Sequence, residues 1–118
     1  MVVNRNQNKL GKCMICLRRH DEDICNLSNR EVRELWAVIR RVKAALESCF
    51  QPGHFNYSFL MNQDAHVHLH VIPRYYDVHV SAGFEFCDMQ NVIDLRLPRA
   101  PHEQVTTVIR EALSSTCT

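Results

Sequence analysis

The chain has 118 residues, which is enough for a single domain over residues 1–118 with its own core and too few for two. Hydrophobic residues make up 46% and charged residues 23%, and the formal charge is +1, so the balance does not point to a nucleic acid or a membrane surface as a partner. No apolar run approaches the roughly 20 residues of a membrane-spanning helix, and residues 1–10 lack the hydrophobic segment of a signal peptide. We therefore expect a cytoplasmic protein whose six cysteines are reduced thiols.

Two segments in the first half of the chain have clear patterns. The apolar run Cys13–Leu17 predicts a short buried strand. Ser28 and Glu31 then have the spacing of a helix capping box, and apolar residues recur after them every three or four positions, as on one face of a long helix. These positions are Val32, Leu35, Ile39, Val42, Leu46 and Cys49. Pro52 and Gly53 end the predicted helix.

The middle of the chain predicts a pair of strands. Alternating apolar and polar residues predict a strand over Phe55–Met61, and the polar residues 62–65 predict a turn. A second strand covers His66–Ile72 and is closed by Pro73. Because the two strands are joined by a short turn, we expect an antiparallel hairpin.

The last third of the chain is less regular. Residues 76–99 show no pattern of their own and are predicted to be irregular, with Gly83, Phe84 and Phe86 as anchors. A C-terminal helix begins at Pro101. The order strand, helix, strand, strand, helix indicates an α+β fold with helices packed on a mainly antiparallel sheet.

The segment that carries chemistry is the run of alternating histidines at 66–72. Side chains alternate between the two faces of a strand, so His66, His68 and His70 should project from one face. The apolar residues between them should project from the opposite face, which the long helix can cover. Three imidazoles in a row are difficult to explain as packing, because each buried polar ring needs a partner.

Metal binding is one interpretation of this pattern. Alternate residues on a strand are about 6.6 Å apart, so a neighbouring pair of histidines can chelate one ion but all three can hardly share it. A third ligand would come from His54, His79 or Cys87, and the spacing does not favour one of them. The pair Cys13 and Cys16 resembles half of a zinc site, but residues three apart on a strand face opposite sides, which favours two buried thiols.

Nucleophilic catalysis on phosphorus is the other interpretation. A neutral imidazole can attack a phosphoryl centre, and a second imidazole on the same face can donate to the phosphate oxygens or the leaving group. This chemistry needs histidines side by side with one of them held as the correct tautomer, as the spacing at 66–70 allows.

The segment His66–Ile72 resembles the signature of the histidine triad (HIT) family, in which three histidines alternate with apolar residues and two apolar residues follow, and all seven positions match. The order of the flanking segments is also similar, from Asn4 to Phe86, and Pro73-Arg74 resembles the dinucleoside polyphosphate hydrolase branch. The resemblance implies a HIT-like fold: an antiparallel sheet of about five strands, one long helix across it and a C-terminal helix. It also implies a homodimer.

The resemblance implies a role for each site residue. His68 would attack the α-phosphate of a nucleoside polyphosphate, such as a diadenosine polyphosphate, or of a nucleoside phosphoramidate, and form a covalent nucleotidyl-histidine. His70 would contact the phosphate and assist the leaving group, and His66 would order the triad from behind. Asn4 would bind the ribose hydroxyls, and Asn62 would face the phosphates, with Gln63 as a substitute for a leaving-group contact. The protein itself would require no cofactor and no metal, although a divalent cation can accompany a polyphosphate substrate.

The chain departs from the family pattern in three places. The loop before the triad is shorter than in many relatives, Lys12 stands where many have a histidine, and the strands that precede Asn4 in the family are short or missing. Two other functions therefore remain as alternatives to the enzyme: a non-catalytic nucleotide-binding module, and a His/Cys metal-binding protein for zinc or copper.

Overall fold

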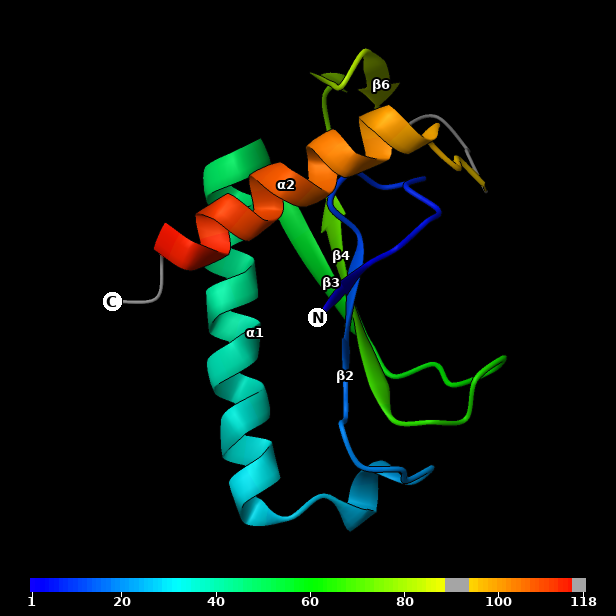
Figure 1. Ribbon diagram of the computed structural model, residues 1–118, viewed down its shortest axis with the longest axis vertical. Helices are drawn as coiled ribbons and strands as arrows, with labels where there is room; N and C mark the ends of the chain where they lie inside the picture. Colours follow the sequence, from blue (N-terminus) through cyan, green and yellow to red (C-terminus); the bar gives the residue numbers. More distant parts are fainter. Residues whose placement is uncertain (89–93, 116–118) are drawn as a thin grey trace.

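The computed structural model describes residues 1–88 and 94–115, and it confirms the predicted α+β class (Figure 1). In chain order the elements are β1 (Val2–Val3), β2 (Cys13–Cys16), a 3-10 turn (Ile24–Asn26), α1 (Asn29–Phe50), β3 (His54–Ser58), β4 (His68–Arg74), β5 (His79–Ser81), β6 (Phe84–Phe86) and α2 (Arg99–Ser115). The main sheet is antiparallel with the order β1-β2-β4-β3, and β5 and β6 form a separate pair. The expected sheet of about five strands is thus four strands and a hairpin.

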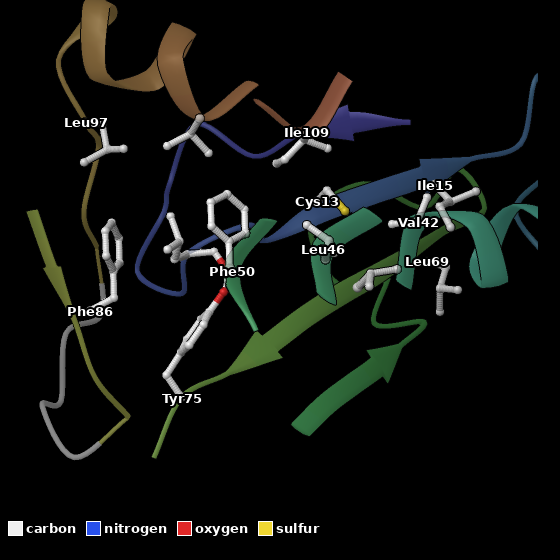
Figure 2. Close-up of a cluster of buried hydrophobic side chains, with 13 residues drawn as sticks. Cys13, Ile15, Val42, Leu46, Phe50, Leu69, Tyr75, Phe86, Leu97 and Ile109 are labelled. Atoms are coloured by element: carbon white, nitrogen blue, oxygen red, sulfur yellow. Dashed lines mark hydrogen bonds between the residues drawn. The ribbon is translucent and has the colours of Figure 1, made fainter. Parts of the chain in front are cut away.

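The two helices cover one face of the main sheet. Cys13 and Ile15 on β2 and Leu69 and Val71 on β4 are buried on that face. They belong to one core with α1 and α2, whose buried members include Val42, Leu46, Phe50, Val105 and Ile109 (Figure 2). The alternation on β4 therefore places its apolar residues under the helices and its histidines on the opposite face, which we call the open face.

Helix α1 forms largely as its sequence predicts. The Ser28 hydroxyl accepts from the backbone N–H of Glu31, and the Glu31 carboxylate accepts from the backbone N–H of Ser28, which completes the capping box. The helix ends at Phe50, and Gln51, not Gly53, takes the left-handed conformation, with φ of 51°. Among the described residues, neither α1 nor α2 is long and apolar enough to cross a membrane.

The strands on either side of the loop 59–67 are shifted from their predicted bounds. They pair antiparallel as expected, but β3 already ends at Ser58, and β4 begins only at His68. Pro73 lies inside β4 and does not close it. Proline is tolerated there because β2 pairs with β4 only as far as Val71, so Pro73 has a neighbouring strand on one side only.

The prediction that residues 76–99 are irregular is wrong for two short strands, β5 and β6. The turn between them contains Ala82 and Gly83, both with positive φ (51° and 81°), as a tight hairpin requires. Alanine rarely adopts this conformation, so the sequence carries no clear turn signal. Phe86 is buried in the core as expected. Helix α2 begins two residues before Pro101, which occupies its first turn.

The loop between β1 and β2 is held by a buried glutamine. Gln7 is fully buried, and its Nε2 donates to the carbonyl oxygens of Asn4 (2.8 Å) and Lys12 (2.9 Å). Its Oε1 accepts from the backbone N–H of Gly11 at 2.9 Å. One side chain thus supplies the hydrogen bonds that a strand ladder would otherwise supply, and it fixes the backbone on both sides of the loop.

We expect Gln7→Ala to lower the free energy of unfolding by about 1–3 kcal/mol, because it leaves the Gly11 N–H without its partner and removes one hydrogen bond from each of the Asn4 and Lys12 carbonyl oxygens. Urea denaturation measures the change. Gln104→Ala, on the exposed side of α2, is the matched control and should change stability by less than about 0.5 kcal/mol. Equal stability of the two variants would contradict the role assigned to Gln7.

Candidate active site

The open face of the sheet brings together side chains from β2 and β4. Cys16 lies opposite His68 and Met14 lies opposite His70 in the antiparallel register. Cys16 is exposed, so the expectation of two buried thiols is wrong for this residue, while Cys13 is buried among the core side chains. The two sulfurs of this pair face opposite sides of the sheet, as residues three apart on a strand must.

The ring of His68 is oriented by the main chain. Its Nδ1 lies 2.6 Å from the carbonyl oxygen of His66. A carbonyl oxygen can only accept, so Nδ1 carries the proton, and in the neutral ring the lone pair resides on Nε2. His68 is 8% exposed, so this nitrogen is held in a largely desolvated but reachable position. The local fold therefore selects the tautomer that a nucleophilic Nε2 requires.

His70 lies next to this lone pair. The Nε2 atoms of His68 and His70 are 3.2 Å apart, and the rings meet edge to face with centroids 4.8 Å apart. Because Nε2 of His68 accepts, Nε2 of His70 donates in this contact, and its Nδ1 is then an acceptor that is buried without a hydrogen-bond partner in the described part of the chain. Partial burial, together with the charges of His68 and Lys12, lowers the pKa of His70 from its ordinary value of 6.5.

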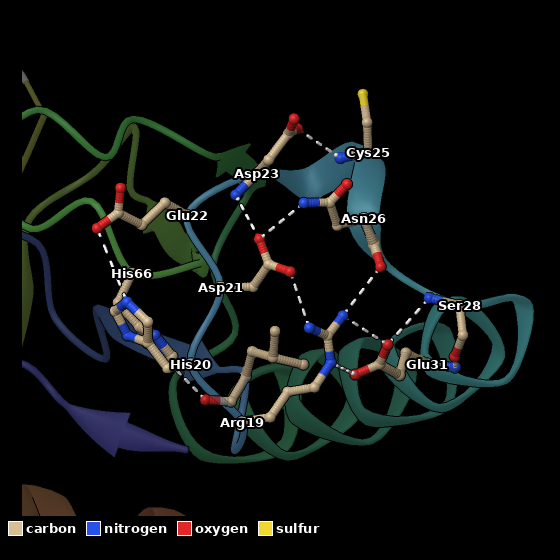
Figure 3. Close-up of polar contacts among 11 residues, drawn as sticks. Arg19, His20, Asp21, Glu22, Asp23, Cys25, Asn26, Ser28, Glu31 and His66 are labelled. Atoms are coloured by element: carbon tan, nitrogen blue, oxygen red, sulfur yellow. Dashed lines mark hydrogen bonds and ion pairs between the residues drawn. The ribbon is translucent and has the colours of Figure 1, made fainter.

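The backbone carbonyl of His66 orients His68, whereas the His66 ring contacts Leu17 and His20. Its Nε2 donates to the carbonyl oxygen of Leu17 at 2.6 Å, and its ring stacks on His20 with centroids 5.4 Å apart (Figure 3). The ring of His66 is thus held by Leu17 and His20, next to the peptide that orients His68, and β4 begins only at His68. His20 carries no sequence signal that would have linked it to the triad.

The segment that carries His20 is fixed to the start of α1. The Arg19 guanidinium donates to both carboxylate oxygens of Glu31, at 2.8 and 3.0 Å, and to Asp21 at 2.8 Å (Figure 3). Hydrogen bonds from Arg19 and from the backbone of Ser28 hold the pKa of Glu31 down at about 2. This exposed network orders the polar loop that follows β2, and so it positions His20 and the Leu17 carbonyl behind His66.

The predicted nucleotide-binding residues lie in two different loops. Asn4 pairs with Lys12 at the N-terminal edge of the sheet, through its backbone N–H to the Lys12 carbonyl at 3.0 Å. Its side-chain Oδ1 is buried without a hydrogen-bond partner among the residues described. Asn62 and Gln63 are exposed in the loop between β3 and β4, and the structure records no hydrogen bond that joins either of them to the histidines within the described ranges.

Of the cations Lys9, Lys12 and Arg74, two are paired with a carboxylate. Arg74 donates to Asp88 at 2.8 Å and to the Asn56 side-chain oxygen at 2.6 Å, and Lys9 forms an ion pair with the same Asp88 at 3.1 Å. Lys12 forms no ion pair within residues 1–88 and 94–115. Partial burial lowers its pKa.

A metal centre has little support in this arrangement. Within the described ranges, no group of three or more His, Cys, Asp or Glu side chains is placed to hold a metal ion. Of the third ligands that the sequence left open, His54 lies on β3 beside Asn56, while His79 packs against Phe50 and Tyr75 on the helix-covered side of the molecule. Two imidazoles side by side can act as a nucleophile and a hydrogen-bond donor.

Comparison with known families agrees with this geometry. The model of the HIT domain matches residues 2–77, which is more than half of the chain and includes β1 to β4 with the three histidines. The chain therefore belongs to the HIT family, and a general nucleotide-binding or hydrolase-type function follows from that membership.

Solved structures show the same fold at low sequence identity. A hypothetical histidine triad nucleotide-binding protein from Sulfolobus tokodaii is 17% identical with a TM-score of 0.74, and the match covers 96% of this chain and 76% of that one. A histidine triad protein from Bradyrhizobium japonicum is 19% identical with a TM-score of 0.75, covering 94% and 81%. A zinc-bound histidine triad family protein from Mycobacterium smegmatis is 18% identical with a TM-score of 0.63, covering 96% and 76%.

We expect the imidazole of His70 to titrate below pH 6.5, because burial disfavours its charged form and the neighbouring cations oppose protonation. NMR titration of the histidine ring signals measures the midpoint directly. Lys12→Met removes one of these cations and should raise the midpoint of His70. A midpoint at or above 6.5 in the unmodified protein would contradict the environment described for this ring.

Proposed function

We propose that this protein is a nucleotidyl hydrolase or transferase that cleaves at the α-phosphate of a nucleoside polyphosphate or a nucleoside phosphoramidate. One observation carries the proposal. The backbone carbonyl of His66 accepts a hydrogen bond from Nδ1–H of His68, which leaves the lone pair of His68 on Nε2, where it accepts from the His70 imidazole at 3.2 Å. A residue that only binds nucleotides has no need of this tautomer, so the arrangement favours catalysis over the non-catalytic alternative.

The proposed reaction has two steps. His68 Nε2 forms a bond to the α-phosphorus while the bond to the leaving group breaks, and the leaving group departs with the bonding electron pair. His70 Nε2–H turns from His68 to the phosphoryl oxygens, where negative charge develops. Water then attacks the same phosphorus, releases its proton to solvent, and the electron pair of the broken N–P bond returns to His68. The product is a mononucleotide.

The positive charge on the phosphorylated His68 ring has a defined partner. Once Nε2 is bonded to phosphorus, the ring is an imidazolium, and its Nδ1–H still donates to the His66 carbonyl at 2.6 Å in the resting geometry. A charge-assisted hydrogen bond of this kind is stronger than a neutral one, so the same contact that selects the tautomer also stabilises the intermediate.

Three further residues, Asn4, Asn62 and Gln63, are proposed to bind the nucleotide. Asn4, whose Oδ1 is buried without a partner in the described part of the chain, is proposed to accept hydrogen bonds from the ribose hydroxyls. Asn62 and Gln63 are proposed to reach the phosphates or the leaving group from the exposed loop before β4. These residues supply binding, while His68 and His70 supply chemistry, and no protein-bound metal enters either step.

We also propose that two copies of the chain pair side by side. β3 is an outer strand of the sheet, and Tyr57, Phe59 and Leu60 are exposed on and after it, by 42%, 36% and 55%. An unpaired edge with apolar side chains is a template for strand addition, and the same edge of a second copy would satisfy it.

Sedimentation should give a mass of twice the 13.8 kDa of one chain. Tyr57→Glu places a charge on the β3 edge and should shift the protein toward the monomer. Val2→Glu places the same charge on the opposite outer strand, β1, and should leave the mass unchanged. A monomeric unmodified protein, or equal effects of the two substitutions, would contradict pairing along β3.

Replacement of His68 by alanine should abolish turnover, because the bond-forming atom is lost and with it the two-step route. The affinity for nucleotide should change little, since ribose and phosphate contacts remain. Incubation with an adenosine polyphosphate labelled in the α-phosphate should leave an acid-labile label on the unmodified protein, and peptide mapping should locate it at His68. His70→Ala should slow the reaction by roughly 100-fold or more and still permit labelling, because it removes charge stabilisation only.

His54→Ala is the matched control, since His54 is an exposed histidine on the neighbouring strand. It should keep both label and turnover. Nucleotide binding without any covalent label would favour the non-catalytic binding module, and label on a residue other than His68 would refute the assignment of the nucleophile.

A further inference from the structure

Lys12 lies on the open face beside His70. It precedes Met14 by two positions, and Met14 is the register partner of His70, so the alternation of β2 places the Lys12 side chain on the face of the histidines. Two hydrogen bonds fix the backbone of Lys12. Its carbonyl oxygen accepts from the Asn4 N–H at 3.0 Å, and its own N–H donates to the Lys9 carbonyl at 3.1 Å. Burial, the charge of His68 and the charge of Lys12 lower the pKa of His70.

Lys12 differs from Lys9 and Arg74 in having no carboxylate partner within the described ranges. Asp88 pairs with both Lys9 and Arg74, and so it neutralises much of the charge of those two residues. Lys12 is half-buried and forms no ion pair in the described ranges. Partial removal of an ammonium from water costs free energy unless an anion is near it, so this position favours an anionic ligand.

The neighbours of Lys12 indicate which part of a ligand would reach it. Lys12 lies between Asn4 and His70. The Oδ1 of Asn4 and the Nδ1 of His70 are both buried without a hydrogen-bond partner among the described residues. A nucleotide with its ribose at Asn4 and its α-phosphate, which is the 5′-phosphate, at His68 and His70 would bring that phosphate close to Lys12.

We propose that Lys12 binds the α-phosphate of the nucleotide together with His70, and that its charge makes this protein bind a nucleoside 5′-phosphate more tightly than the nucleoside. The inference rests on the proposed function for the identity of the ligand. Lysine stays charged at pH 7 and acts on phosphate as a point charge. Lys12 is thus a binding residue of this site.

Calorimetric titration with adenosine and with AMP tests this inference without turnover. Lys12→Met should weaken AMP binding about tenfold or more and leave adenosine binding unchanged, because only the phosphate contact is lost. Lys12→Arg keeps the charge and should restore most of the AMP affinity. Asn4→Ala should weaken both ligands by a similar factor. Lys43→Met, on α1 beside Phe55 and on the helix-covered side of the sheet, should change neither.

Two results would overturn the assignment of Lys12. An unchanged AMP affinity in Lys12→Met shows that the phosphate does not contact this residue. Equal losses for adenosine and AMP, not restored in Lys12→Arg, show that Lys12 only shapes the loop. The labelling of His68 in the same preparations separates this inference from the catalytic proposal. If His68 is labelled and Lys12→Met binds AMP as tightly as the unmodified protein, the lysine site alone is refuted. If Lys12→Met selectively loses AMP affinity and the unmodified protein takes up no label, the lysine site is supported and the catalytic proposal is refuted.

Discussion

The alternation of side chains along β4 is the constraint on which the rest of the molecule depends. Leu69 and Val71 are almost fully buried beneath α1, and this burial fixes which face of the strand meets the helix. A shift of the register by one residue would place the histidines in the core and the apolar residues in water, at a cost of several kcal/mol for the exposed apolar area alone. The hydrophobic core therefore determines the position of His68 and His70, although neither imidazole contributes to it.

The selection of the reactive tautomer is a property of the backbone. The His66 carbonyl holds the Nδ1 proton of His68, and the ring of His66 is committed to the Leu17 carbonyl and to stacking on His20. The first histidine of the triad thus acts on the second through a peptide group. Substitution of His66 removes the ring contacts with Leu17 and His20 that hold this peptide in place. It leaves the backbone oxygen that accepts from His68.

The N-terminal loop shows a second way of placing functional groups. Asn4 and Lys12 are adjacent because the β1–β2 register continues to them, with the Asn4 N–H on the Lys12 carbonyl, and Gln7 bonds the carbonyl oxygens of both. The loop is further held by His102 of α2, whose Nε2 lies 3.1 Å from the Asn4 carbonyl oxygen, and by Asn6, whose side chain accepts from the Leu95 backbone. A buried amide and contacts from the C-terminal part of the chain replace the regular sheet at this edge, so the ligand-facing residues of the loop share the stability of the core.

The sequence by itself determined the α+β class, helix α1 with its cap, the pairing of β3 with β4 and the opposite facing of Leu69 and His68, because these features depend on local periodicity and on capping chemistry. It also identified His68 and His70 as neighbours. Only the tertiary structure decided the orientation of the His66 ring, the exposure of Cys16, the burial of Gln7, the hairpin of β5 and β6 and the isolation of the Lys12 charge. The orientation of the His66 ring and the isolation of Lys12 depend on partners distant in the chain, Leu17 for His66 and Asp88 for the two paired cations. Local patterns fix which face a residue occupies, but a hydrogen bond or an ion pair between distant segments forms only when packing of the whole domain brings them together.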